Sequence, residues 1–220
     1  MMLTLATVAL AVFLSIGQSI SSVAVPGLDR ASEAWVVAHQ QVVLSRLFVG
    51  ITVLGGITAM RIVALAGAIY LWTRRRRVMA IGVLAIPFAA NAFFDAMKSH
   101  YARPRPFGLG VPSDPSYAFP SGHATVSTAV CATLAFVLWR DGRIGARTAA
   151  VAAIAAPLII GASRVYLDVH WLTDVFGGWC AGLFIASLAA MLYDLVTRRQ
   201  AVGDARRARS TPPTSRTYTT

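Results

Sequence analysis

The sequence predicts an all-α, polytopic membrane protein in which six transmembrane helices cross the bilayer. The chain of 220 residues is 56% hydrophobic and only 13% charged, whereas a soluble domain usually carries about 25% charged residues. Several apolar runs approach the length of about 20 residues with which a helix spans a bilayer. The alternating segments of about ten residues that build a membrane β-barrel do not occur.

The first apolar run covers residues 1–22 and is interpreted as the first membrane helix. It lacks the basic residues that precede the apolar core of a secretory signal, although the Ser-Ser-Val-Ala that follows leaves cleavage open as an alternative. Residues 23–46 contain the helix breakers Pro26 and Gly27 and then mix apolar with polar side chains. This mixture is typical of an amphipathic segment in the membrane interface, where His39 is expected to lie at the surface.

Five further apolar runs complete the six spans. The second span contains Arg61, and an arginine at membrane depth is expected to face the bundle or a wet cavity. Two roles stay open for it: contact with the functional site, or a structural role with a snorkelling or internally paired side chain. Cys131 and Cys180 fall within apolar runs and are expected to be buried without a disulfide. The five runs are residues 47–72, 78–97, 121–139, 148–162 and 171–196.

The chain is therefore divided into one membrane domain, residues 1–197, and a tail, residues 198–220. The tail is basic and rich in Pro, Ser and Thr, a composition that predicts disorder.

The distribution of charge predicts which loops share a membrane face. The net charge is +11, but most basic residues flank apolar runs, which is the pattern that sets membrane topology rather than one that binds nucleic acid. Thirteen basic residues fall on one side of the six-span layout, within residues 74–77, 140–147 and 198–216, and six fall on the other. We therefore expect both termini in the cytoplasm and the loops after the third and fifth spans on the extracytoplasmic face.

The loop after the third span, residues 98–119, offers cations for an oxyanion. Five prolines between residues 104 and 120 forbid a regular helix there. Lys98 and Arg105, seven positions apart, combine a point-charge ammonium with a planar guanidinium, which suits a tetrahedral oxyanion. Arg103 between them is interpreted either as part of this site or as a basic residue at the membrane edge.

The sequence Pro120-Ser121-Gly122-His123 opens the fourth span. A helix start presents free N–H groups and the positive end of the helix dipole. Ser121 suits the N-cap position, and Gly122 lets a ligand approach the backbone closely. These features predict an anion cradle. His123 beside it either donates a proton to a leaving oxygen or is a first-turn residue that faces lipid headgroups.

Residues 163–174 form a polar stretch between the last two apolar runs. Arg164 is a third cation, and His170 and Asp174 lie one helical turn apart if a helix begins there. A carboxylate so placed holds the imidazole in one tautomer and leaves its other nitrogen free to attack. The residues alone do not tell which of the two histidines attacks. No Asp/Glu cluster with metal spacing is present, which argues against a metal-dependent phosphatase.

Three motifs occur in order along the chain: Lys98-x6-Arg105-Pro106, then Pro120-Ser121-Gly122-His123, then Ser163-Arg164-x5-His170-x3-Asp174. Together they resemble the type 2 phosphatidic acid phosphatase family, also called the lipid phosphate phosphatase family. Vanadium haloperoxidases and bacterial acid phosphatases share its phosphate site. No motif residue is missing, and the six-helix layout extends the resemblance to nearly the whole chain.

The resemblance implies a role for each motif residue. The histidine that matches His170 is the nucleophile and forms a phosphohistidine, and Asp174 orients it. His123 protonates the leaving group and then activates water. His100 and Asp168 lie at variable positions within the motifs and are expected to be neighbours of the site. No metal or other cofactor is used. The phosphate ligands are Lys98, Arg105, Ser121, Gly122 and Arg164.

The resemblance also implies a substrate class. We expect an integral-membrane enzyme that removes phosphate from a lipid phosphate or diphosphate of the phosphatidic acid, phosphatidylglycerol phosphate or undecaprenyl diphosphate type. The lipid substrate and the bilayer are its expected partners, without nucleic acid. A membrane protein that binds lipid phosphates without catalysis is the alternative, and the complete motifs argue against it. A transporter would show internal repeats or paired broken helices, and we find none. Activity is expected to be bell-shaped in pH if His170 must be neutral while His123 is protonated.

Overall fold

The computed structural model describes residues 1–20, 25–106 and 116–210. Five of its helices, α1, α5, α6, α7 and α8, are long and apolar enough to cross a membrane, and α3 with α4 makes a sixth candidate span that is bent by 45°. The all-α membrane architecture is thus confirmed. The helices are α1 (Met2–Ile20), α2 (Gly27–His39), α3 (Val42–Leu54), α4 (Ile57–Thr73), α5 (Arg77–Tyr101), α6 (Gly122–Arg140), α7 (Ala146–Tyr166) and α8 (Leu172–Ser210).

The second span consists of two helices, whereas the sequence predicts one continuous span over residues 47–72. Gly55 and Gly56 separate α3 from α4, because glycine has a low helix propensity. A Cβ atom on Gly55 would lie 2.2 Å from Cγ2 of Ile160 on α7. The close approach of α7 therefore requires a glycine at this point.

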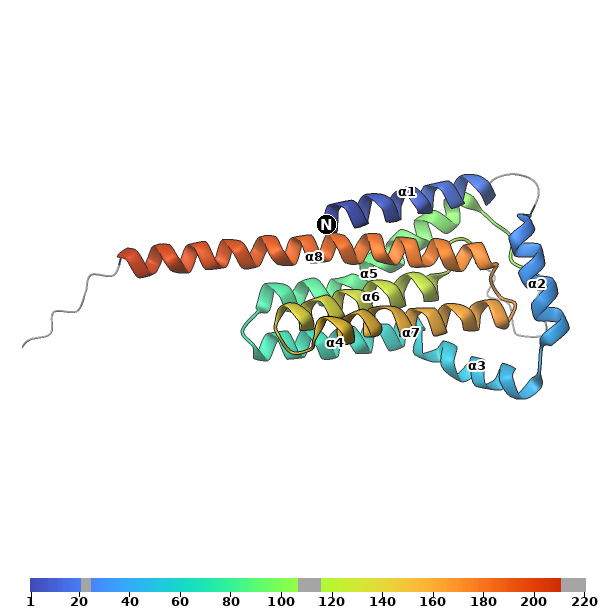
Figure 1. The fold of residues 1–220 in the computed structure, drawn as a ribbon, viewed down its shortest axis with the longest axis horizontal. Coiled ribbons are helices and arrows are strands. Elements are labelled where there is room, and N and C mark those ends of the chain that lie inside the picture. The colour runs from blue at the N-terminus through green and yellow to red at the C-terminus, as the bar shows by residue number, and fades with distance from the viewer. Residues whose placement is uncertain (21–24, 107–115, 211–220) are drawn as a thin grey trace, which may run out of the picture.

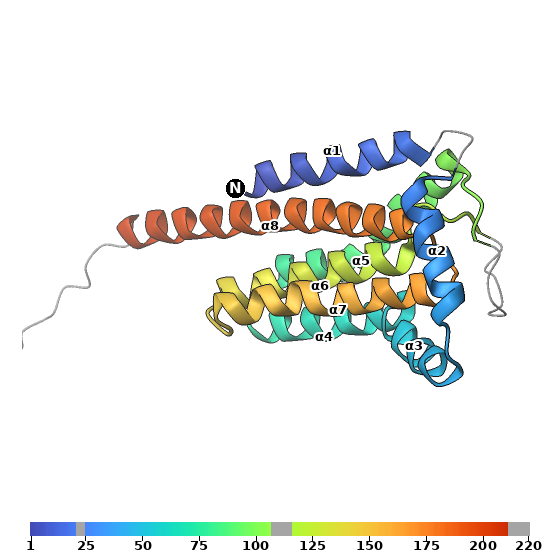
Figure 2. The same ribbon diagram turned by 45° about the vertical axis from the view of Figure 1, so that its right-hand side comes forward.

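Helix α2 lies across one end of the helix bundle (Figures 1 and 2). The predicted amphipathic segment is a helix there, with Asp29 and Val36 buried and Trp35 and Val37 exposed. His39 is exposed, as expected, and its ring stacks on Trp35 with 4.7 Å between centroids. Residues 21–24, which hold the alternative cleavage site, lie outside the described residues.

Helix α6 packs closely against α8. A Cβ atom on Gly178 of α8 would lie 2.8 Å from the carbonyl oxygen of Ser121, and one on Gly182 would lie 2.6 Å from that of Thr125. Small residues at such contacts allow the backbones of membrane helices to approach each other. This contact fixes the first turn of α8 beside the first turn of α6.

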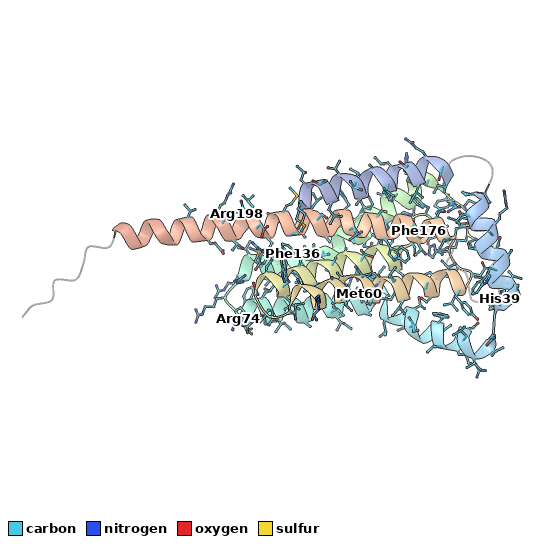
Figure 3. The ribbon with its side chains drawn as sticks, viewed as in Figure 1. His39, Met60, Arg74, Phe136, Phe176 and Arg198 are labelled. Atoms are coloured by element: carbon cyan, nitrogen blue, oxygen red, sulfur yellow. The ribbon has the colours of Figure 1, made fainter. Side chains whose placement is uncertain are left out.

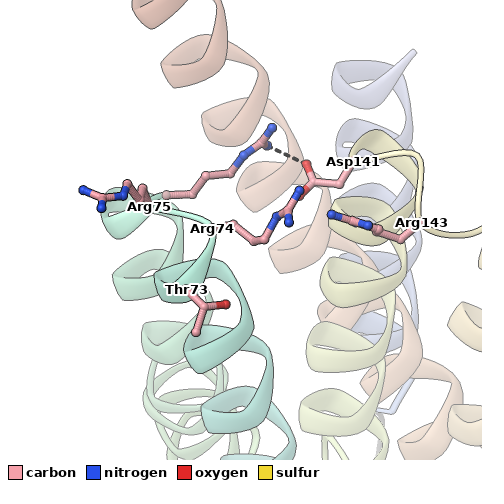
Figure 4. A pocket seen from close by; sticks show the side chains of 6 residues that line it. Thr73, Arg74, Arg75, Asp141 and Arg143 are labelled. Carbon is pink, nitrogen blue, oxygen red and sulfur yellow. Dashed lines mark hydrogen bonds and ion pairs between the residues drawn. The ribbon is translucent and has the colours of Figure 1, made fainter.

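Arginines gather at the end of the bundle opposite α2. Figure 3 shows Arg74 at this end and His39 at the other. Arg76 donates a hydrogen bond to Asp141 at 2.5 Å, and Asp141 also accepts one from the hydroxyl of Tyr193 on α8. The turn before α5 is thereby tied to α8. The arginines line a pocket of 370 Å³ (Figure 4), whose walls are formed by Thr73, Arg74, Arg75, Arg76, Asp141 and Arg143.

Two charged segments differ from the simplest expectation. Arg61 is exposed on α4 instead of facing the bundle. Its guanidinium lies 4.7 Å from the ring centroid of Phe88, a cation–π contact that fits the structural role. Residues 198–210 are helical instead of disordered, because α8 continues through Ser210. Ala, Arg and Gln in this segment are strong helix formers. The last part of the predicted tail, residues 211–220, lies outside the described residues.

The two cysteines are free, as expected, although both are only half-buried: Cys131 lies on α6 and Cys180 on α8. The remaining predicted spans are present with shifted ends. The fifth extends to Tyr166 rather than to residue 162, and the third continues to Tyr101.

Candidate active site

The three sequence motifs meet at the end of the bundle that α2 covers. Figures 1 and 2 show the C-terminal ends of α5 and α7 and the N-terminal ends of α6 and α8 at this end. Lys98 lies in the last turn of α5, although the sequence predicts a loop from this residue onward. Arg164 lies in the last turn of α7, and Asp174 lies in the first turn of α8.

His170 lies in the turn between α7 and α8, two residues before α8 begins at Leu172. Its Nδ1 atom is 3.4 Å from Oδ2 of Asp174, which also accepts the backbone N–H of Trp171 at 2.9 Å. The carboxylate of Asp174 therefore both caps α8 and holds the imidazole of His170. A carboxylate at Nδ1 favours the tautomer with hydrogen on Nδ1, which leaves the lone pair of Nε2 available.

Arg105 lies against the other side of the imidazole. Its Nη1 is 3.0 Å from Nε2 of His170 and donates to the carbonyl oxygen of Val169 at 2.6 Å. Its Nε donates to the carbonyl oxygen of Ser116 at 2.8 Å, while Nζ of Lys98 donates to Oγ of Ser116 at 2.7 Å. Ser116 thus holds the two cations of the first motif together. The sequence gives no signal for this role.

The surroundings of His170 disfavour its protonated form. The side chain is only 3% exposed. Burial, and next the positive charges of Arg105, Arg164 and Lys98, hold the pKa of His170 well below its ordinary value of 6.5. His170 is therefore neutral near pH 7, as an attacking imidazole must be.

The N-terminus of α6 forms the floor of the site. Ser121 occupies the N-cap position, but its side chain makes no capping hydrogen bond, contrary to the prediction. Its Oγ atom is buried and has no hydrogen-bond partner within the described part of the chain. Its backbone N–H donates instead to the carbonyl oxygen of Asp174 at 3.0 Å. A buried hydroxyl beside the free N–H groups of a first helical turn is suited to an anionic ligand.

The break between α3 and α4 forms a wall beside His123. A Cβ atom on Gly56 would lie 3.9 Å from Nε2 of His123. Arg164 donates from Nη1 to Oγ1 of Thr52, the last buried residue before the break, at 2.8 Å. The sequence predicts neither Gly56 nor Thr52 as part of the site. The charged and titratable groups that act on His123 are Arg164, His170, Lys98 and Arg105.

Arg103 is buried behind Asp174 and does not lie at the membrane edge. It is 6% exposed, and it forms ion pairs with Asp174 at 2.5 Å and with Asp29 at 2.6 Å. Asp29 belongs to α2 and is fully buried. The sequence does not predict this pairing, because Asp29 stands among the other polar residues of an amphipathic segment.

His100 and Asp168, the two motif residues expected to be neighbours of the site, lie in different environments. His100 is exposed and packs edge-on against Tyr101. Asp168 is buried in the turn before His170 with φ of +52°, a backbone conformation that Asp tolerates better than most residues. Within residues 1–20, 25–106 and 116–210, no group of three His, Cys, Asp or Glu side chains is arranged to hold a metal ion.

Comparisons with known proteins identify similar sequences. A family model described as the PAP2 superfamily matches residues 78–198. Phosphatidylglycerophosphatase B of Bacillus subtilis (strain 168) is 29% identical over 178 residues, which cover 79% of this chain and 87% of the relative. Undecaprenyl-diphosphatase of Sulfolobus acidocaldarius is 31% identical over 129 residues, which cover 53% of this chain and 57% of the relative.

A solved structure has the same fold. It is described as the crystal structure of the first transmembrane PAP2 type phosphatidylglycerolphosphate phosphatase from Bacillus subtilis. The similarity has a TM-score of 0.75 and 26% sequence identity, and it covers 87% of this chain and 96% of that chain.

Proposed function

The chain belongs to the PAP2 superfamily and is a lipid phosphatase, and from this premise we propose that it hydrolyses a membrane lipid phosphate or diphosphate through a phosphohistidine intermediate. One observation carries the proposal. Lys98, Arg105 and Arg164 lie close enough to act electrostatically on both His123, in the first turn of α6, and His170, in the turn before α8. Three cations and a helix N-terminus match the charge and shape of a phosphoryl group.

In the first proposed step, Nε2 of His170 attacks phosphorus. The N–P bond forms as the bond between phosphorus and the leaving oxygen breaks, and His123 gives its proton to that oxygen. Arg105 contacts Nε2 of His170 at 3.0 Å, so it turns from this nitrogen to a phosphoryl oxygen when substrate binds. Asp174 stabilises the positive charge that the imidazole acquires.

In the second proposed step, water attacks the phosphohistidine. His123 takes a proton from the water, the N–P bond breaks, and inorganic phosphate leaves. Lys98, Arg105, Arg164, the hydroxyl of Ser121 and the N–H groups from Gly122 onward bind the phosphoryl oxygens in both steps. No step uses a metal ion.

The substrate class follows from the relatives. One is named for phosphatidylglycerophosphate and another for undecaprenyl diphosphate, and both substrates carry a terminal phosphate on a membrane lipid. We place the site on the extracytoplasmic face and both termini in the cytoplasm. The support is the gathering of arginines at the end of the bundle away from α2, since basic residues mark the cytoplasmic side.

Purified protein tests the proposal with phosphatidic acid, phosphatidylglycerophosphate and undecaprenyl diphosphate as substrates. We expect phosphate release from at least one of them to persist in a chelator of divalent metals. Rapid quenching should trap an acid-labile phosphoenzyme, which His170→Asn should abolish because the attacking nitrogen is lost. His39→Asn, at an exposed histidine of α2, is the matched control and should label normally. A strict metal requirement, or labelling of the His170 variant, would contradict the mechanism.

A further inference from the structure

A buried network of charges connects α2 with the Asp174–His170 pair. Asp29 and Asp174 are fully buried, and Arg103 between them is 6% exposed. Nη1 of Arg103 lies 2.5 Å from Oδ1 of Asp174, and Nη2 lies 2.6 Å from Oδ2 of Asp29. Nη1 also donates to Oγ1 of Thr173 at 2.8 Å. One guanidinium is thus shared between two carboxylates.

Asp29 also binds the first turn of α8 directly. Its Oδ1 accepts the backbone N–H of Thr173 at 2.9 Å, and its Oδ2 accepts the hydroxyl of Thr173 at 2.7 Å. A carboxylate at a helix N-terminus is stabilised by the free N–H groups and by the helix dipole. Helix α2, which lies across the end of the bundle (Figure 1), is therefore attached to α8 one residue before Asp174.

The charge of this network suits the proposed chemistry. Asp29, Arg103 and Asp174 together carry a net charge of −1 when all three are ionised. If Arg103 were paired with Asp174 alone, its charge would cancel that of Asp174. Because Asp29 shares the guanidinium, Asp174 keeps negative charge toward Nδ1 of His170. That charge is required when Nε2 takes the phosphoryl group and the imidazole becomes positive.

We propose that Asp29 and Arg103 are positioning residues for phosphoryl transfer: Asp29 fixes Arg103 and the first turn of α8, so that Asp174 holds His170 in line with the phosphate while remaining negatively charged. The proposal rests on the phosphohistidine mechanism proposed above. The side-chain polar contacts of Asp29 and Arg103 are with each other, with Thr173 and with Asp174, so both act through Asp174. The interfacial helix α2 is then a functional part of the enzyme, because it delivers Asp29.

Substitution of Asp29 tests the proposal in the full-length protein. Asp29→Asn keeps the shape of the side chain and removes its charge. We expect kcat to fall by about tenfold or more, since small displacements of reacting groups cost up to about a hundredfold. KM and inhibition by inorganic phosphate should change little, because the phosphate ligands are untouched. Glu33→Gln removes a half-buried carboxylate one turn further along α2 and is the matched control, with unchanged kcat.

The variants Arg103→Gln and Asp29→Asn/Arg103→Gln complete a double-mutant cycle. Because the two residues act as one unit, the loss of kcat in the double variant should be clearly smaller than the product of the two single losses. Thermal unfolding identifies variants that fail to fold. If Asp29→Asn is among them, Thr173→Val removes the shared hydroxyl and leaves all charges in place, and kcat should again fall at constant KM.

Three results would overturn the proposal: unchanged kcat in Asp29→Asn, losses that simply multiply in the double variant, or equal losses of kcat and phosphate binding. The rate of phosphoenzyme formation separates this proposal from the mechanism on which it rests. If the wild-type protein forms no phosphohistidine, the mechanism fails. If the wild-type protein forms it and Asp29→Asn forms it at the same rate, only the positioning role fails.

Discussion

At the scale of single residues, His170 is a buried imidazole surrounded by cations. Burial, and next the neighbouring cations, hold the pKa of His170 well below its ordinary value of 6.5. Between the folded and unfolded pKa values, the unfolded chain therefore binds more protons than the native protein. The free energy of unfolding therefore falls as pH falls below about 6.5, while above this pH the contribution of His170 is fully present.

This direction of the pH dependence leads to a prediction for His170→Asn, because the asparagine side chain does not titrate. Between about pH 7 and about pH 5, the wild-type protein should lose more thermal stability than the variant does. Unfolding temperatures of both proteins in the same detergent, measured across this range, check the difference. The control is Gly82→Ala on α5, which replaces no titratable group and adds a Cβ atom where nothing lies within 4 Å, so it should leave the wild-type slope unchanged. Equal slopes for wild type and His170→Asn would contradict the prediction.

The sequence predicts the residues proposed to bind phosphate or to react with it better than the residues that hold them in place. Lys98, Arg105 and His170 are recognised because their residue types and spacing match a motif. Asp29 is not, because it lies 144 positions from its partner Thr173 and only the fold brings them together. Ser121 shows a different failure, since the preference of serine for the N-cap predicts a hydrogen bond that its buried Oγ does not make.

At the scale of secondary-structure elements, the contact between α6 and α8 sets the geometry of the site. The two helices carry His123 and Asp174 in their first turns. Glycines keep the two backbones close. A Cβ atom on Gly182 would lie 2.5 Å from the Cβ atom of Thr128 and 2.6 Å from the carbonyl oxygen of Thr125. Because one of these atoms belongs to the backbone, a larger residue forces the helices apart.

We therefore predict that Gly182→Ala destabilises the protein by about 1–3 kcal/mol, as overpacking of a tight contact does, and also lowers kcat. The matched control is Gly82→Ala on α5, where a Cβ atom meets nothing within 4 Å and should stabilise the helix by about 0.5–1 kcal/mol. Denaturant unfolding and phosphate release provide the two measurements. If Gly182→Ala and Gly82→Ala behaved alike, the contact would not control the site.

Hydropathy predicts the helices but not their interruptions. An apolar run shows where a helix can cross a bilayer, and α5 and α6 lie where such runs occur. The same signal continues through Gly55 and Gly56, so the break between α3 and α4 is not visible in it. The steric cause, Ile160 of α7 against Gly55, exists only in the folded protein.

At the scale of the whole molecule, arginines gather at one end of the helix bundle and the proposed active site lies at the other. Arg74, which lines the arginine pocket, lies at one end, and α2 covers the other (Figures 1 and 3). A count of basic residues in the loops predicts this polarity without any structure, because topology follows charges that flank the spans. It does not predict which loop residues meet, since that depends on how the spans pack.

The proposed orientation is tested by labelling single cysteines with a reagent that does not cross membranes. In a background in which Cys131 and Cys180 are replaced by alanine, His39→Cys on α2 should react in intact cells. Gly145→Cys, in the turn before α7 where a Cβ meets no other atom within 4 Å, should react only after lysis. The reverse pattern would place the site in the cytoplasm.

The break at Gly55 and Gly56 also suggests how a lipid substrate would approach the site. Irregular backbone at membrane depth occurs only inside protein or along a water-filled cavity, and this break lies beside His123. We therefore expect a lipid phosphate to reach the histidines beside this break while its tail stays in the bilayer. The substrate then moves in two dimensions, and its mole fraction in the membrane, rather than its bulk concentration, sets the turnover rate. We expect dilution with inert lipid at constant total substrate to slow the enzyme.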